Sequence, residues 1–266
     1  MAAVGEETVG YETILVARTG DGVATVTLNR PEAMNSFNQR MREEFAAVWA
    51  ELNADDEVRA VVLQAADGRA FSTGIDVKQG LVHPENIWAK RDPGEMLGPK
   101  SNKVWKPVVC AVHGMAAGGA FYWITESDIV ICSEEATFFD PHVSYGMVAA
   151  LEPIGLSYRV GASHALRMAL MGLDERVTAS TALQIGLVTE VVARAELRAR
   201  AHEIAATIAA KPTSAVQGTV RAFWESLDVG RSTALERGLA YATIGSPDGI
   251  RTVDRTTYVK PQPRLR

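Results

Sequence analysis

The segment PVVCAVHGMAAGGA (residues 107–120) joins a continuous apolar run to a glycine-rich end. Residues 108–112 carry only apolar side chains, which is typical of a strand buried on both faces of a parallel sheet. The glycines that follow predict a tight turn leading into a helix. His113, three glycines and the flanking charges of Lys106 and Glu126 argue against a membrane span here, although the apolar character continues to Ile124. A strand, a turn and a helix of a soluble domain are therefore predicted.

Other strands and one helix are visible on either side of this segment. Val58 to Gln64 and Asp128 to Cys132 are apolar runs of the same kind. Glu12 to Ala17 and Val23 to Leu28 are rich in β-formers and are separated by Thr-Gly-Asp-Gly, which predicts a hairpin. From Ser36 onward apolar residues recur at helical spacing, and Ser36 with Gln39 fits a capping box. The helix-spaced residues are Phe37, Met41, Phe45, Val48, Trp49 and Leu52.

The second half of the chain is predicted to be mostly helical. Beyond Glu152 only a short strand near Val188 to Val192 interrupts the helical pattern, and no linker-like tract appears. We therefore predict a sheet-bearing core over residues 1–200 and a helical region over residues 201–266 that ends in a basic tail. The stretch from Gly80 to Ser101 is dense in helix breakers and predicts a long functional loop or lid.

Composition and charge limit the class of protein. The chain has 266 residues with 27 Lys and Arg against 32 Asp and Glu, a net charge of -5, which argues against nucleic acid as a partner. Cys110 and Cys132 lie in apolar runs without metal-ligand spacing, which favours buried thiols in a reducing compartment. No signal peptide pattern is visible at the N-terminus. The sequence predicts a cytoplasmic protein with no membrane span and no metal site.

Two glycine-containing segments each follow a predicted buried strand. They are residues 69–76 (RAFSTGID) and residues 113–120 (HGMAAGGA). Neither matches a nucleotide-binding fingerprint, because GxGxxG and the Lys-Ser/Thr of a phosphate loop are absent. Glycine at the end of a strand leaves a backbone N–H exposed, and two such groups aimed at one point form an oxyanion hole. Taken singly, each segment also fits a simple packing turn.

Together the two segments resemble the signature of the crotonase superfamily, the enoyl-CoA hydratases and isomerases. The first segment carries Phe71, Gly74 and Asp76, and the second, about forty residues further on, carries Ala111, Gly114, Gly118 and Gly119. Further similar stretches follow in the expected order along most of the chain. They are Leu28-Asn29-Arg30-Pro31, Ser127-Asp128-Ile129-Val130, Ala136-Thr137-Phe138 and the segment from Ala182 to Val188.

The resemblance implies an α/β fold in which ββα units form a spiral, followed by a helical region that mediates assembly into trimers or dimers of trimers. It implies an acyl-CoA thioester as substrate or ligand, with no further cofactor. The thioester oxygen would be held by the backbone N–H groups of Ile75 and Gly119. Arg30, Arg69 and Lys78 are the nearby cations that could meet CoA phosphates, although each also fits a solvated surface charge.

Two departures from the family pattern bear on the reaction. Hydratases of this family carry one Glu on the helix after the second glycine segment and another in a Pro-Glu pair, whereas this chain has Tyr122 and His142 at these positions. A two-Glu hydration mechanism therefore cannot be transferred. His142 could act as a base, oriented by Asp140 or Glu152, and Tyr122 could donate a hydrogen bond to a developing anion. Alternatively, both side chains fill space where catalysis has been lost.

The sequence thus predicts an acyl-CoA enzyme of the lyase or isomerase class that stabilises a thioester enolate. His142, Tyr122 and Asp140 are its candidate catalytic residues, and it is not expected to be a standard hydratase. The alternative is a non-catalytic acyl-CoA binding protein of the same fold. Two other polar residues are given structural interpretations: Glu126 as a packing or subunit-contact residue, and His113 as a hydrogen-bonded core histidine.

Overall fold

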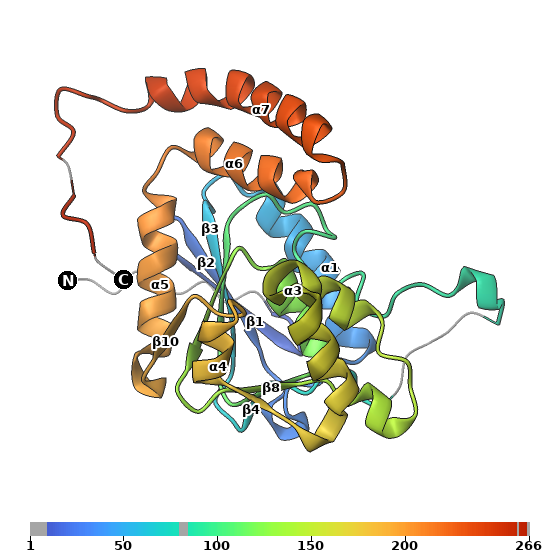
Figure 1. The fold of residues 1–266 in the computed structure, drawn as a ribbon. Coiled ribbons are helices and arrows are strands. Elements are labelled where there is room, and N and C mark those ends of the chain that lie inside the picture. The colour runs from blue at the N-terminus through green and yellow to red at the C-terminus, as the bar shows by residue number, and fades with distance from the viewer. Residues whose placement is uncertain (1–9, 80–84, 260, 265–266) are drawn as a thin grey trace.

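The computed structural model describes residues 10–79, 85–259 and 261–264, and its core is a twisted parallel sheet (Figure 1). Six strands form this sheet in the order β1-β2-β3-β5-β7-β10. Their bounds are β1 Ile14–Thr19, β2 Val23–Leu28, β3 Ala60–Ala65, β5 Val108–Val112, β7 Ile129–Ser133 and β10 Glu190–Val192. β1 pairs antiparallel with β2 as the predicted hairpin, and the other neighbours are parallel.

A second, smaller sheet has the order β4-β6-β8-β9. Its strands are β4 Ala70–Ser72, β6 Met115–Ala117, β8 Thr137–Phe139 and β9 Val177–Thr178. β3, β5 and β7 belong to the large sheet, and the next strand after each of them, β4, β6 and β8, belongs to the small one. The turn between β5 and β6 depends on Gly114, whose φ is +59° and on which a Cβ would lie 2.3 Å from the carbonyl oxygen of Arg69. This repetition gives the spiral of ββα units that the family resemblance implies.

Helices cover both faces of the large sheet. α1 (Gln39–Ala54) packs with Phe45, Val48 and Trp49 into the larger apolar core, and α5 (Leu197–Ala209) covers the opposite face with Leu197 and its buried alanines. Because hydrophobic side chains alternate between the two faces of each strand, one strand serves both cores. Within β3, for example, Val61 faces the α1 side and Val62 the α5 side.

The remaining core helices follow the small sheet. They are α2 (Phe121–Glu126), α3 (Leu151–Met171), which is broken at Gly161, and α4 (Ala179–Gln184). Short 3₁₀ turns lie at Pro31–Ala33, Ile87–Ala89, Gly118–Ala120, His142–Tyr145, Gly172–Asp174 and Arg194–Glu196. The turn at Gly118–Ala120 runs directly into α2, so the glycine segment opens a helix as expected.

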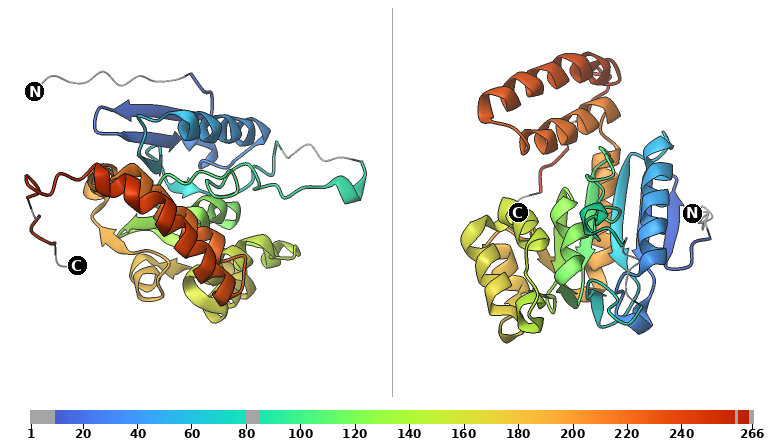
Figure 2. Two further views of the ribbon diagram at one scale, coloured as in Figure 1. Left: turned by 90° about the horizontal axis from the view of Figure 1, so that it is seen from above. Right: turned by 90° about the vertical axis from the view of Figure 1, so that its right-hand side faces the viewer.

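The last two helices form a pair outside the sheet layers. α6 (Thr213–Ser226) and α7 (Arg231–Arg251) pack against each other and lie above the core (Figures 1 and 2). The boundary predicted between residues 200 and 201 falls inside α5, whose buried Ala201 and Ala205 pack on the sheet. The helical extension therefore begins at α6.

Some local predictions need adjustment. α1 begins at Gln39 with Asn38 as its cap, because the Asn38 side chain accepts the backbone N–H of Met41. The predicted capping box of Ser36 and Gln39 is wrong, since Ser36 donates its hydroxyl to Ala33 instead. Cys110 and Cys132 are buried free thiols, as predicted. In the part of the chain that the structure describes, no helix is long and apolar enough to cross a membrane.

Candidate active site

The two glycine segments meet backbone to backbone. Gly74 has a φ of +80°, and a Cβ placed on it would lie 2.7 Å from the backbone nitrogen of Gly119. Conversely, a Cβ on Gly119 would lie 3.4 Å from the Cα of Gly74 and 2.5 Å from the ring of Phe37. Only glycine fits at either position, because any side chain would separate the two loops. The segments after β4 and β6 are thus brought together as the sequence predicts.

Two backbone N–H groups at this junction have no acceptor among the described residues. Phe37 and Ile75 form a parallel β-bridge. Its two hydrogen bonds are donated by the backbone N–H groups of Phe37 and Asp76, so the N–H of Ile75 donates no hydrogen bond to the described chain. Within the described ranges, the N–H of Gly119 likewise has no backbone or side-chain acceptor. Unpaired backbone donors are rare in buried segments. An oxyanion hole needs two such donors aimed at one point, and these two lie on adjacent loops.

Asp140 and His142 form a close pair beside these loops. β8 ends at Phe139, and the next residue, Asp140, is fully buried. Its Oδ1 lies 2.5 Å from Nδ1 of His142, and its Oδ2 has no partner in the described chain. A Cβ placed on Gly118 would lie 3.6 Å from Cε1 of the His142 ring. The imidazole therefore stands next to the second glycine segment.

Glu152, near the start of α3, completes the group. Its Oε1 lies 3.8 Å from Nε2 of His142, which is too long for a hydrogen bond. The hydrogen bond with Asp140 raises the pKa of His142, and burial raises the pKa of Glu152. An imidazole held at Nδ1 by a carboxylate keeps Nε2 available for a proton.

The same three side chains have ligand-type atoms within 4.8 Å of one another, a spacing that a cation could also use. A metal ion about 2.1 Å from each ligand would hold Nδ1 and Oδ1 roughly 3 Å apart or more. The 2.5 Å contact between these atoms fits a hydrogen bond better.

Tyr122 points its hydroxyl at a residue that the sequence did not single out. The phenol donates a hydrogen bond to Oδ1 of Asp92 at 2.7 Å. Burial first, and this hydrogen bond second, raise the pKa of Tyr122. A Cβ on Gly94 would lie 2.2 Å from the ring, so that glycine is required for the loop to pack on Tyr122. No sequence pattern marks Asp92, because it lies in an irregular segment thirty residues before its partner.

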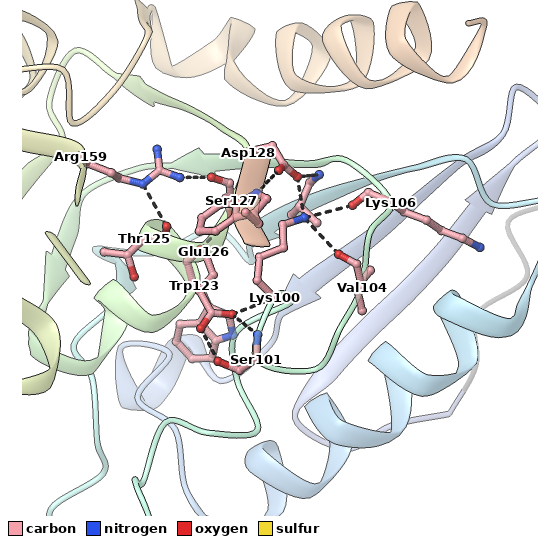
Figure 3. Close-up of polar contacts among 12 residues, drawn as sticks. Lys100, Ser101, Val104, Lys106, Trp123, Thr125, Glu126, Ser127, Asp128 and Arg159 are labelled. Carbon is pink, nitrogen blue, oxygen red and sulfur yellow. Dashed lines mark hydrogen bonds and ion pairs between the residues drawn. The ribbon is translucent and has the colours of Figure 1, made fainter. Parts of the chain in front are cut away.

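Glu126, one helical turn after Tyr122, anchors the same loop (Figure 3). Its carboxylate accepts the backbone N–H groups of Lys100 and Ser101 at 2.7 Å each, as well as the Ser101 hydroxyl. Lys100 in turn forms an ion pair with Asp128 at 2.8 Å. The segment from Asp92 to Ser101 is therefore fastened to α2 at both ends. The part of the predicted lid at residues 80–84 lies outside the described residues.

The three predicted CoA-binding cations differ in their surroundings. Arg30 is buried, forms an ion pair with Asp76 at 2.9 Å and donates to the carbonyl of Ser36 at 2.6 Å. The Asp of the first signature segment is therefore used internally, and Arg30 holds that segment rather than facing solvent. Arg69, the first residue of the segment, and Lys78, two residues after its end, are exposed.

His113 is buried but lies away from this group. It lines a separate cavity of about 240 Å³ with Arg194 and Arg198, on the α5 face of the sheet. Burial lowers the pKa of His113 to about 4, and its Nε2 has no hydrogen-bond partner in the described residues. The prediction of a core histidine is confirmed, but the expected hydrogen bond is not found.

Comparison with known proteins agrees with this architecture. The family model described as enoyl-CoA hydratase/isomerase matches residues 18–246. The (E)-benzylidenesuccinyl-CoA hydratase of Thauera aromatica is 34% identical over 84% of this chain and 85% of its own. The 1,2-epoxyphenylacetyl-CoA isomerase of Escherichia coli is 31% identical over 75% of this chain and 77% of its own.

Solved structures show the same fold. A crystal structure of an enoyl-CoA hydratase/isomerase from Mycobacterium paratuberculosis superposes with a TM-score of 0.83. It is 37% identical in sequence and covers 91% of this chain and 95% of its own. An enoyl-CoA hydratase from Mycobacterium smegmatis has a TM-score of 0.77 at 27% identity, over 87% of this chain and 90% of its own.

Proposed function

The chain belongs to the enoyl-CoA hydratase/isomerase family, and we propose that it catalyses proton transfer at the α-carbon of an acyl-CoA thioester with His142 as the base. The observation that carries this proposal is the contact between Asp140 and Nδ1 of His142, which leaves Nε2 free next to the second glycine segment. The names of the relatives, which are acyl-CoA hydratases and isomerases, support an acyl-CoA substrate.

In the proposed step, Nε2 of His142 removes a proton from the α-carbon and the electron pair moves onto the thioester oxygen as an enolate. The N–H groups of Ile75 and Gly119 would hold that oxygen, each donor contributing about 2.7–4 kcal/mol to the transition state. The buried carboxylate of Asp140 stabilises the imidazolium that forms. Glu152, whose pKa is raised by burial and whose Oε1 lies 3.8 Å from Nε2 of His142, would return a proton to the substrate. This acid-base pair supports an isomerase or lyase reaction.

In this proposal Tyr122 shapes the pocket and the exposed cations bind CoA. The hydroxyl of Tyr122 is already donated to Asp92, so we assign the phenol to shaping the pocket at the position where hydratases keep a Glu. Arg69, which begins the first glycine segment, and Lys78, which follows it, are the candidate contacts for CoA phosphates. Arg30 supports that segment through Asp76. Neither a metal nor a further cofactor enters any step.

Assembly and location complete the proposal. We propose a homotrimer or a dimer of trimers, because α7 exposes several large apolar side chains. These are Leu235, Leu239, Ile244 and Ile250. Light scattering of the purified protein tests this assembly. A cytoplasmic location stays a prediction from the sequence.

Exchange of the α-protons of butyryl-CoA in D₂O, followed by NMR, tests the proposed step directly. The protein should catalyse exchange, and His142→Gln should abolish it while butyryl-CoA still binds. Binding without exchange in the unmodified protein would instead support the non-catalytic acyl-CoA binding protein.

A further inference from the structure

A large cavity lies between the active site and the helical extension. Its volume is about 830 Å³, and its walls come from α2, α3, α6 and the segment from Asp92 to Trp105. We call it the α6 cavity and define it by Trp105, Tyr122, Leu151, Tyr158, Phe223 and Trp224. Ligand pockets for small molecules fall in this range of volume.

The α6 cavity begins next to the proposed acid-base group. Tyr122 lines it and lies three residues after Gly119, which is roughly 5 Å along the helical turns. Leu151 also lines it and immediately precedes Glu152. An acyl group whose thioester oxygen meets the two glycine segments would therefore extend into this cavity.

The walls are aromatic on several sides. Tyr122 comes from α2, Tyr158 from α3, Phe223 and Trp224 from α6, and Trp105 from the loop. Flat aromatic side chains bind rings better than thin chains, because stacked and edge-to-face contacts use the whole ring face. Trp224 is fixed in place because its Nε1 donates to Asp128 at 2.6 Å.

Most polar groups in the cavity walls form hydrogen bonds or ion pairs with other protein groups. Lys100 pairs with Asp128, and Glu126 accepts its hydrogen bonds from the loop (Figure 3). Arg159 donates to the carbonyls of Thr125 and Ser127 at the end of α2. The lining carboxylates outnumber the lining cations, so that a carboxylate on the ligand would be repelled. The carboxylates are Asp92, Glu126, Asp128, Glu225 and Asp228, and the cations are Lys100 and Arg159.

The volume of the α6 cavity also argues against a short linear chain as the preferred acyl group. At the roughly 30 Å³ that one water occupies, a four-carbon chain would fill only about 120 Å³ of the space. We propose that the α6 cavity holds the acyl group and that the preferred acyl group is uncharged and carries a ring. This inference rests on the proposed function, because the thioester must lie at the two glycine segments.

Calorimetric titration with unreactive saturated thioesters tests the inference on the full-length protein. The probes are CoA, butyryl-CoA, 3-phenylpropanoyl-CoA and 3-(4-carboxyphenyl)propanoyl-CoA. We expect 3-phenylpropanoyl-CoA to bind at least tenfold more tightly than butyryl-CoA, and the carboxylated ring to lose most of that advantage. Equal dissociation constants for the butyryl and phenylpropanoyl thioesters would overturn the cavity assignment while leaving the proposed function standing. Failure of every thioester to bind would overturn both.

Variants locate the effect within the cavity. Phe223→Ala should reduce the preference for the ring several-fold, whereas Leu170→Ala, an exposed apolar truncation near the end of α3, should leave it unchanged. Thr219→Trp fills the cavity from α6 and should abolish the preference while butyryl-CoA still binds. Light scattering confirms that each variant keeps its assembly. An unchanged preference in both Phe223→Ala and Thr219→Trp would contradict the inference.

Discussion

Oδ1 of Asp140 lies 2.5 Å from Nδ1 of His142 and accepts the backbone N–H of the same residue at 3.1 Å. The carboxylate therefore fixes both the position of the imidazole and the nitrogen that carries the proton. A neutral His142 held in this way has its lone pair on Nε2. This pair is the reason we propose His142 as the base at a position where hydratases of the family carry Glu.

Replacing His142 should separate catalysis from binding. His142→Gln keeps polarity and much of the bulk but removes titration, so kcat should fall by about 10²–10⁴ while acyl-CoA affinity stays within a few-fold. Steady-state kinetics and calorimetry on the same sample measure the two effects. An unchanged kcat would reduce His142 to a space-filling residue.

The pH dependence of activity should identify the same pair. Because the hydrogen bond that His142 donates to Asp140 raises the pKa of His142 above its usual value of 6.5, the imidazole stays protonated to higher pH, whereas a base role requires the neutral form. Activity should therefore rise with pH through a midpoint above 6.5. Asp140→Asn should move this midpoint down and lower kcat, as measured by pH-rate profiles of both proteins. A midpoint that stays in place in Asp140→Asn would contradict the assignment.

The same shift in pKa has a consequence for stability. A histidine with a raised folded pKa stabilises the fold fully below its unfolded pKa of about 6.5, and this contribution is lost as pH rises through the folded pKa. Catalysis and this part of the stability thus change in opposite directions over one pH window.

Local patterns were sufficient for much of the fold. The hairpin of β1 and β2, the buried strand β5 and the amphipathic α1 follow from periodicity and turn residues, which act over a few residues. The two glycine segments were also visible, because each follows a strand directly. The cap at Asn38 was missed because Ser36 offers an equally good local pattern and only the entry angle of the chain decides between them.

The rest of the site depends on tertiary contacts that no local pattern encodes. Asp92 reaches Tyr122 across thirty residues, and Arg30 is drawn to Asp76 across forty-six. From the sequence motif alone, Arg30 was a candidate to bind a CoA phosphate. In the structure Arg30 is buried and its guanidinium pairs with an internal carboxylate. Glu152 approaches His142 after the chain turns at Gly146, where φ is +73°, before α3 begins.

Removing the N–H of Ile75 should test the oxyanion hole with little damage to the fold. Gly119→Pro would also remove a donor, but the packing of Gly119 against Phe37 leaves no room for a ring. Ile75→Pro removes an N–H that makes no bond within the described chain, and it should lower kcat by about 10²–10³. Ile75→Val is the matched control and should stay near normal. Full activity in a folded Ile75→Pro protein would rule out this donor.

Glycine at position 98 should be required for docking of the loop on α2. A Cβ there would lie 2.1 Å from Oε2 of Glu126, and that carboxylate is held by three hydrogen bonds. Gly98→Ala should therefore destabilise the protein by about 1–3 kcal/mol in denaturant unfolding. Gly218→Ala in α6, where nothing lies within 4 Å, should instead stabilise it by about 0.5–1 kcal/mol. Equal effects of the two changes would show that the loop does not pack as described.

Hydration of crotonyl-CoA should be absent or very slow. Addition of water needs one group to activate the water and another to protonate the α-carbon, and both Glu positions of the hydratases are replaced here. The hydroxyl of Tyr122 is bound to Asp92 and its pKa is raised, so it is a poor base for water. The loss of the conjugated enoyl absorbance on adding pure protein measures the reaction. Rapid turnover would mean that Glu152, 3.8 Å from Nε2 of His142, supplies the second group. In that case Glu152→Gln should abolish hydration, whereas Glu236→Gln on the exposed face of α7 should not.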